Sequence, residues 1–142
     1  MRARTLAGLL IAVLVVLGAR NIALASFRDE APADEYFGPF KVSVLEIRNR
    51  LVRFEGQENR ELGRPSAIHG MDAVETAIED WHRKYPRDSW LPGFLSRMVG
   101  VYVRAGARHD SHARHAYAML EGEYRRTAPA HEAARAARRM FT

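Results

Sequence analysis

The sequence predicts an all-α fold, a small bundle of about five helices packed as antiparallel hairpins after a cleavable N-terminal signal peptide. Three observations lead to this prediction. Apolar residues recur at steps of three and four through most of the chain, as one face of a helix requires. Proline, glycine and N-capping residues divide these stretches into single helix lengths. The chain has no cysteine, so an apolar core rather than disulfides must stabilise it.

Residues 1–25 are expected to be the signal peptide. Arg2 and Arg4 precede an uncharged apolar run over residues 6–19, and Ala-Leu-Ala at 23–25 matches the pattern of small residues before a cleavage site. Cleavage would fall before Ser26 and export the protein to the periplasm or beyond.

The alternative for this segment is a retained inner-membrane anchor formed by residues 6–27. A spanning helix needs about 20 apolar residues, and Arg20 interrupts the apolar run before that length is reached. The anchor therefore requires Arg20 to extend its charged end toward the membrane surface.

Positive charge is concentrated toward the C-terminus. Residues 104–142 hold eight basic and four acidic side chains, within a chain of formal net charge +5. Because a secreted protein seldom meets nucleic acid, the expected partner is an acidic protein surface or anionic lipid, with Arg135, Arg138 and Arg139 as the candidate interaction residues. The alternative is a solvated face on which the positive charges of the arginines stabilise the C-terminal end of the helix dipole.

The first part of the exported chain is expected to consist of a lead-in, a helix and a connector. Residues 26–38 are rich in alanine, proline and acidic residues and predict a flexible lead-in to a single all-α domain over 39–142. A helix is expected from Phe40, because the apolar residues that follow it keep the helical period: Val44, Ile47, Leu51 and Phe54. Residues 55–70 predict a polar connector with a short helical turn, either a ligand-binding loop or a solvated linker.

Three helices are predicted over the central stretch 71–124. The first carries a buried stripe of Met71, Val74, Ile78, Trp81 and Tyr85, and Pro86 ends it. The second starts with Asp88 or Ser89 as N-cap and ends at Gly106, and Asp110 or Ser111 caps the third. A last short helix over 130–141 buries a shallow face of Ala130, Ala134, Ala137 and Phe141.

This central stretch resembles a degenerate helical-hairpin repeat of the tetratricopeptide family. The resemblance covers roughly half of the chain after residue 25. The residues that carry it are Val74, Ile78, Trp81 and Pro86 in the second helix of one repeat, Leu95, Met98, Val99, Tyr102 and Gly106 in the first helix of the next, and Ala113, Tyr117 and Leu120 in the helix after it. The resemblance implies antiparallel helix pairs stacked side by side, and peptide binding is the usual role of the family.

His109, His112 and His115 are the candidate metal ligands. Their spacing of three allows neighbouring histidines to reach one ion, and imidazole binds zinc, copper and nickel. Positions six apart lie about 240° around a helix, so His109 must come from the preceding turn. The alternative is a group of solvated histidines beside a helix N-terminus.

A carboxylate-bridged metal centre needs two E-x-x-H steps. The sequence has a single such step, at Glu79 and His82. Glu75, Glu79 and Asp80 are therefore interpreted as a solvated helix face.

The remaining catalytic motifs are incomplete. His131-Glu132 starts a zinc-protease pattern, but Arg135 stands where the second histidine is needed and a guanidinium does not coordinate zinc. No serine lies in a nucleophile elbow, and there is no glycine-rich phosphate loop.

The sequence thus favours a non-enzymatic protein-interaction or scaffold module of the cell envelope. The alternative is a periplasmic metal-binding helical protein that uses the His109, His112 and His115 cluster, and an enzyme without a recognisable motif ranks third. Apart from a transition metal at these histidines, no cofactor is expected.

Overall fold

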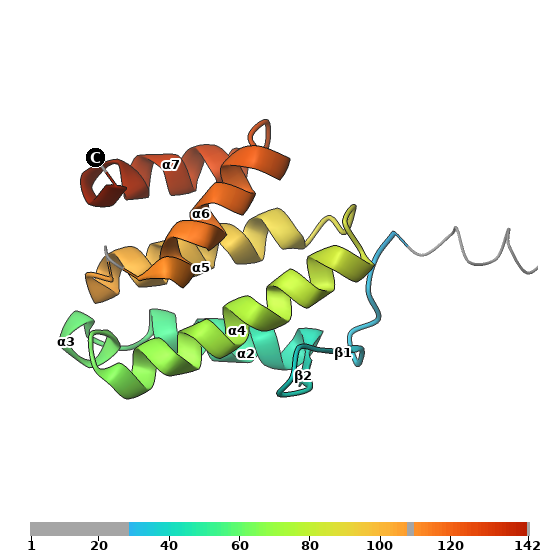
Figure 1. Ribbon diagram of the computed structural model, residues 1–142, viewed down its shortest axis with the longest axis horizontal. Helices are drawn as coiled ribbons and strands as arrows, with labels where there is room; N and C mark the ends of the chain where they lie inside the picture. Colours follow the sequence, from blue (N-terminus) through green and yellow to red (C-terminus); the bar gives the residue numbers. More distant parts are fainter. Residues whose placement is uncertain (1–28, 108–109, 142) are drawn as a thin grey trace, which may run out of the picture.

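The computed structural model describes residues 29–107 and 110–141, and within them the chain is mostly helical (Figure 1). The elements are β1 (Tyr36–Phe37), β2 (Val42–Ser43), α2 (Val44–Glu55), α3 (Asn59–Leu62), α4 (Pro65–Lys84), α5 (Leu91–Ala105), α6 (Ser111–Glu123) and α7 (Ala128–Phe141). The prediction of a small all-α bundle is confirmed. The signal peptide predicted at 1–25 lies outside the described residues. In the described part of the chain, no helix combines the length and the apolar character needed to cross a lipid bilayer.

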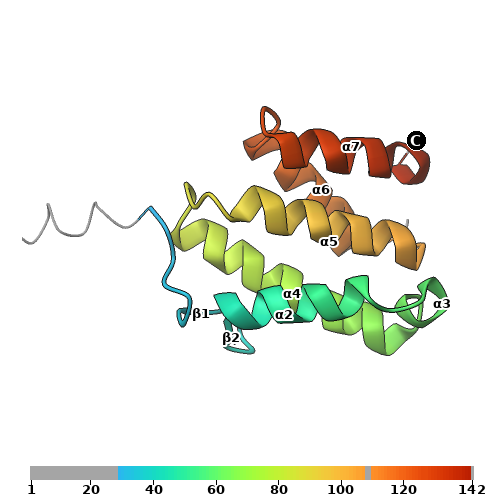
Figure 2. The ribbon, with the colours of Figure 1, turned by 180° about the vertical axis from the view of Figure 1, so that it is seen from behind.

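The helices form two layers. Figures 1 and 2 show α2, α5 and α7 side by side in one layer, with α4 and α6 in the other. From α4 onward, each helix runs opposite to the one before it. Helix α5 lies at the centre and contacts α2, α3, α4, α6 and α7.

A β-hairpin replaces the first turn of the helix that was predicted from Phe40. Strands β1 and β2 pair antiparallel, Tyr36 with Ser43 and Phe37 with Val42. The turn between them has positive φ at Gly38 (67°) and Lys41 (51°), which a helix cannot accommodate. Phe40 is consequently 59% exposed rather than buried. Helix α2 begins only at Val44, after Ser43 caps it by accepting a hydrogen bond from the Glu46 backbone N–H.

The segment expected to be a flexible lead-in is bound to the domain from Glu30 onward, where the Glu30 carboxylate accepts a hydrogen bond from Ser89 at 2.8 Å. Its anchor is Asp88, which is 2% exposed and lies between α4 and α5. The Asp88 carboxylate accepts hydrogen bonds from the Ala31 backbone N–H (2.8 Å), Trp81 Nε1 (2.9 Å) and the Trp90 backbone N–H (2.9 Å). One buried side chain therefore joins the lead-in, helix α4 and the start of α5.

The connector predicted over 55–70 is shorter than expected. Its middle forms the short helix α3, as predicted, and Leu62 is buried there. Helix α4 already begins at Pro65, six residues before the predicted stripe starts at Met71. Proline is well suited to this first helical position because its missing N–H has no partner in the helix there.

The other predicted helices occur in the structure with two differences in detail. The N-cap of α5 is Trp90 rather than Asp88 or Ser89, and Tyr85, expected on the buried stripe, is the half-buried C-cap of α4. Met71, Val74, Ile78 and Trp81 are buried as predicted. Helix α5 ends at Gly106 in the left-handed conformation, with a φ of 70°. Asp110 caps α6 by accepting from two backbone N–H groups, at 2.8 and 3.0 Å.

Helix α7 starts at Ala128, two residues earlier than predicted, and its buried face is also shifted. Ala130, Ala133 and Ala137 face the core, so Ala133 takes the place expected for Ala134. Both alanines lie within the helical period of Ala130, so the period alone could not choose between them.

Trp81→Ala should lower the free energy of unfolding by about 3–5 kcal/mol. The ring is 1% exposed, stacks on Phe37 at a centroid distance of 5.6 Å and also packs on Phe94 at 5.4 Å. Urea unfolding followed by circular dichroism measures the loss. Trp90→Ala is the matched control, because Trp90 is 53% exposed and should cost less than about 1 kcal/mol. A comparably small loss for Trp81→Ala would contradict this packing.

Candidate functional site

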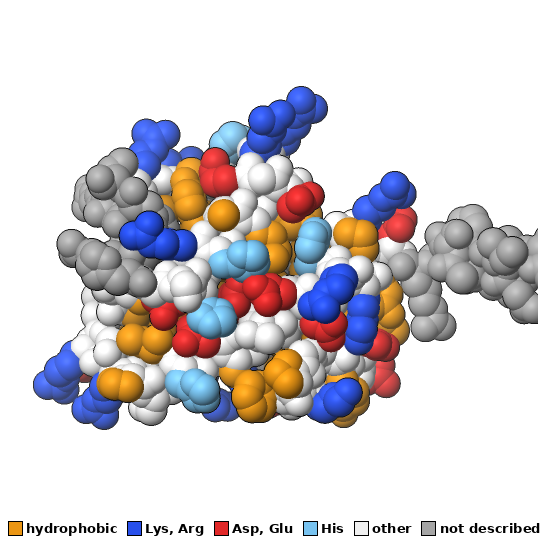
Figure 3. All heavy atoms as spheres, in the orientation of Figure 1, with side chains coloured by type: hydrophobic (Ala, Val, Ile, Leu, Met, Phe, Trp, Pro, Cys, Tyr) orange, Lys and Arg blue, Asp and Glu red, His pale blue; other side chains and the backbone are white. Residues whose placement is uncertain are grey.

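Two histidines of α6 contact two glutamates of α4, within the layer that these two helices form. Glu75 and Glu79 are four residues apart on α4, and His112 and His115 are three apart on α6, so each pair lies along one helix face. His112 Nδ1 is 2.7 Å from Glu75 Oε2, and His115 Nε2 is 2.8 Å from Glu79 Oε1. Figure 3 shows acidic and histidine side chains gathered on this face of the molecule. We call these four residues the α4–α6 cluster.

The prediction that this face of α4 is solvated is wrong for Glu75. Its side chain is fully buried, while Glu79 is 32% exposed. Its Oε2 is hydrogen-bonded to His112, but its Oε1 finds no hydrogen-bond partner among the described residues. That oxygen lies 3.9 Å from His115 Nε2. A buried carboxylate oxygen without a partner is unusual, since leaving a buried polar group unsatisfied costs about 1–3 kcal/mol.

The local environment shifts the protonation of this pair. Burial raises the pKa of Glu75 to about 7, although the hydrogen bond with His112 opposes the shift. The same hydrogen bond is the main cause of the raised pKa of His112. Both shifts mean that the folded protein holds protons more tightly here than the unfolded chain does.

The structure brings together part of the predicted histidine group and adds residues that the sequence reasoning missed. His112 and His115 both belong to the α4–α6 cluster, and His109 lies outside the described residues. His82, the partner of Glu79 in the E-x-x-H step, points elsewhere, with Nδ1 2.8 Å from the Tyr124 hydroxyl. One signal for Glu75 was present in the sequence. It is four residues after Met71 and three before Ile78, which places it on the buried stripe.

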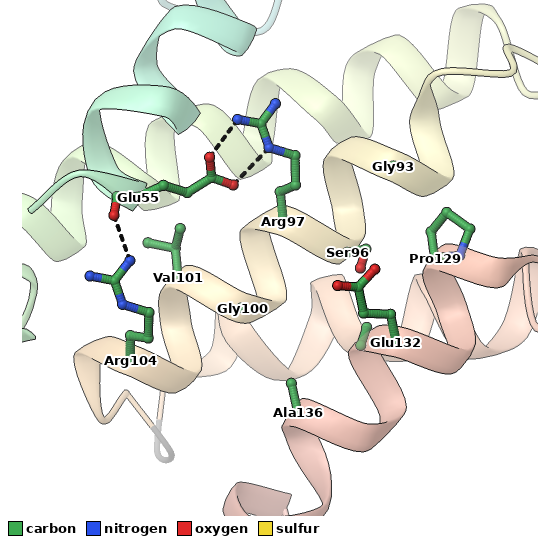
Figure 4. Close-up of a pocket in the computed structure, with 11 residues that line it drawn as sticks. Glu55, Gly93, Ser96, Arg97, Gly100, Val101, Arg104, Pro129, Glu132 and Ala136 are labelled. Atoms are coloured by element: carbon green, nitrogen blue, oxygen red, sulfur yellow. Dashed lines mark hydrogen bonds and ion pairs between the residues drawn. The ribbon is translucent and has the colours of Figure 1, made fainter.

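A second candidate site is a groove along α5 in the opposite layer. Its main hollow, about 420 Å³ in volume, lies between α5, the end of α2 and the start of α7 (Figure 4). A second hollow of about 380 Å³ continues it past Gly93, Arg97 and Pro129 to Trp90. We call this continuous surface the α5 groove. The residues that line its main hollow are Glu55, Gly93, Ser96, Arg97, Gly100, Val101, Arg104, Pro129, Glu132, Ala133 and Ala136.

Ion pairing fixes the side of the groove next to α2. Arg97 donates to both carboxylate oxygens of Glu55, at 2.7 and 2.6 Å, and Arg104 donates to the Glu55 backbone carbonyl at 2.7 Å (Figure 4). The hydrogen bond from Arg97 is the main reason that the pKa of Glu55 is lowered. Such a bidentate pair holds both side chains in one geometry, so this side of the groove is preformed.

Two of the three arginines predicted as interaction residues do not line the groove. Arg135 and Arg138 are exposed on α7, and neither lines the groove. The side chain of Arg139 lies outside the described part of the structure. In the groove, α7 contributes Pro129, Glu132 and alanines.

No protein-family model, curated protein or solved structure matches this chain.

Stability should fall as the pH rises from about 4.5 to about 7. A carboxyl group whose pKa is raised on folding stabilises the protein fully below its unfolded value, and this contribution is lost as the pH rises through the folded value. The raised pKa of His112 acts in the same direction above pH 6.5. For Glu75 the loss amounts to at most about 3 kcal/mol.

Urea unfolding at a series of pH values measures this dependence, with a chelator present because a bound cation would favour the charged carboxylate. Glu75→Gln should flatten the curve over this interval, since the amide does not titrate. A profile of Glu75→Gln that falls as steeply as that of the unsubstituted protein would assign the effect to other groups.

Proposed function

We propose that this protein is a non-enzymatic interaction module of the cell envelope that binds a helical segment of a partner protein in the α5 groove. The proposal places the interaction on the layer formed by α2, α5 and α7. The observation that carries it is the glycine floor of the groove.

Gly93 and Gly100 form this floor without being required by the packing of the domain. A Cβ atom added at either position would meet no described atom within 4 Å outside the backbone of its own helix. Glycine inside a helix costs about 0.5–1 kcal/mol relative to alanine. The two glycines keep the floor low at that cost, and a low floor allows the backbone of a second helix to approach closely.

The dimensions of the groove fit a short helix. From Trp90 to Arg104 the groove follows α5 for about 21 Å, at 1.5 Å of rise per residue, which equals about four helical turns. Recognition of this kind places the apolar face of an amphipathic helix in a groove through side chains at helical spacing. Trp90, 53% exposed at one end, provides an aromatic contact of the type that dominates binding energy.

The charges along the groove specify the polar side of such a partner. Glu132 lies on α7, whereas Arg104 lies on α5 toward α2, where it donates to backbone carbonyls and so keeps its positive charge. Arg97 on the same side is already paired with Glu55. A helix with acidic residues along one edge and basic residues along the other would match both sides. Complementary charges of this kind contribute specificity more than affinity.

The order of the helices also supports the proposal. Helices α2, α5 and α7 alternate with α4 and α6 between two layers, an arrangement expected if the resemblance to tetratricopeptide hairpins reflects stacked pairs. Stacked helical repeats use the extended surface of one layer for binding. The predicted signal peptide favours a partner in the cell envelope.

Gly100→Leu should fill the groove without harming the fold. A Cβ atom at Gly100 meets no described atom within 4 Å outside its own helix backbone, and the rest of the leucine side chain would enter the hollow of about 420 Å³ that Gly100 lines. Because leucine also favours the helix over glycine, the free energy of unfolding should stay unchanged or rise by up to about 1 kcal/mol. Gly122→Leu on α6 is the matched control, because a Cβ at Gly122 also meets open space and Gly122 does not line the groove. Thermal unfolding of both variants measures stability.

Photo-crosslinking in cells tests the binding itself. A photoreactive residue replacing Ser96 on the floor should give one discrete adduct, and the same residue replacing Gly122 should not. Gly100→Leu should abolish the adduct, whereas the fold remains intact. Equal adducts from both positions, or an adduct that persists in Gly100→Leu, would overturn the proposed groove.

A further inference from the structure

Beyond partner binding, we propose that Glu75, Glu79 and His115 form a binding site for a divalent transition-metal ion, with Zn²⁺ as the ion that fits best. The site lies in the layer of α4 and α6, on the other side of the molecule from the α5 groove. It shares His115 with the predicted histidine group, but its other two ligands are carboxylates.

The three ligand atoms already lie close together. One carboxylate oxygen each from Glu75 and Glu79 and one nitrogen of His115 all fall within 4.8 Å of one another. Around tetrahedral zinc, with bonds of about 2.0–2.2 Å, neighbouring ligand atoms are roughly 3.4 Å apart. The distances from His115 Nε2 are 2.8 Å to Glu79 Oε1 and 3.9 Å to Glu75 Oε1, one below and one above this value. The two observed distances therefore lie on either side of the spacing that zinc requires.

The unpartnered oxygen of Glu75 is a second observation that points to a cation. The side chain is fully buried, and its Oε1 has no hydrogen-bond partner within the described residues. It lies on the side of the carboxylate that faces His115. A metal ion between these groups would bind Oε1 and would offset the repulsion between the carboxylates of Glu75 and Glu79. The apolar side chains of the interior can do neither.

His112 acts as a positioning residue for this site. Its Nδ1 is hydrogen-bonded to Oε2 of Glu75, which leaves Oε1 for the ion. The backbone N–H of His112 is in turn fixed by the Asp110 cap at 2.8 Å. Hydrogen bonds that orient a metal ligand in this way typically change the affinity by about 10–100-fold.

The donor set selects the class of ion. One imidazole and two carboxylates suit zinc, whereas calcium and magnesium take oxygen ligands. Three protein ligands leave a coordination position for water or another molecule. Because His115 is 54% exposed and Glu79 32% exposed, that position faces solvent, and an ion can enter from the surface.

Isothermal titration of the purified protein with ZnCl₂, after removal of any histidine tag and of bound metal, tests the site. We expect one Zn²⁺ per chain and no measurable binding of Ca²⁺. Glu79→Gln and His115→Ala should each weaken Zn²⁺ binding by more than about tenfold. Both side chains are partly exposed, so neither change should unfold the domain, and circular dichroism verifies this.

Three further variants make the assignment specific. His69→Ala, which removes an exposed histidine from α4, the helix of Glu75 and Glu79, should leave the affinity for Zn²⁺ unchanged. His112→Ala should weaken binding by about 10–100-fold, and His112→Asn, whose amide can replace the Nδ1 hydrogen bond, should restore most of it. Zinc binding that is unaffected by both Glu79→Gln and His115→Ala, or no binding at all, would overturn the proposal.

Discussion

The packing of α5 is the constraint on which the rest of the structure depends. This helix contacts α2, α4, α6 and α7, and its apolar side chains Leu91, Leu95, Met98 and Tyr102 are fully buried. A helix buried around most of its circumference needs neighbours on several sides, and the two-layer arrangement provides them. The strip with Gly93 and Gly100 remains open. The groove is therefore the side of α5 that the domain itself leaves uncovered.

Much of the fold could be predicted because period and capping act locally. The stripe from Met71 to Trp81, the left-handed Gly106 and the Asp110 cap each depend on residues within a few positions. The hairpin at residues 36–43 was missed for the opposite reason. Phe37 is buried against Trp81, more than forty residues away, and this contact together with the positive φ of Gly38 outweighs the helical spacing that starts at Phe40.

The α4–α6 cluster was predictable only in part. The histidines could be identified by type and spacing, but their partners depend on how α4 and α6 pack, and spacing within one helix does not contain that information. Glu75 shows the difficulty most clearly. Its position on the stripe between Met71 and Ile78 indicated burial, whereas its charge favoured solvent. The structure resolves this conflict by burying the side chain and pairing one of its oxygens with His112.

The two sites lie in different layers, and this separation determines how they can affect each other. A cation held by α4 and α6 would join the two helices that support α5 from behind, and Tyr102 of α5 already donates a hydrogen bond to Asp72 of α4 at 2.8 Å. No ligand proposed for the ion lines the groove. A metal that binds only the folded state stabilises it by mass action. In a protein without disulfides, such an ion would add a cross-link between α4 and α6, the two helices behind the groove.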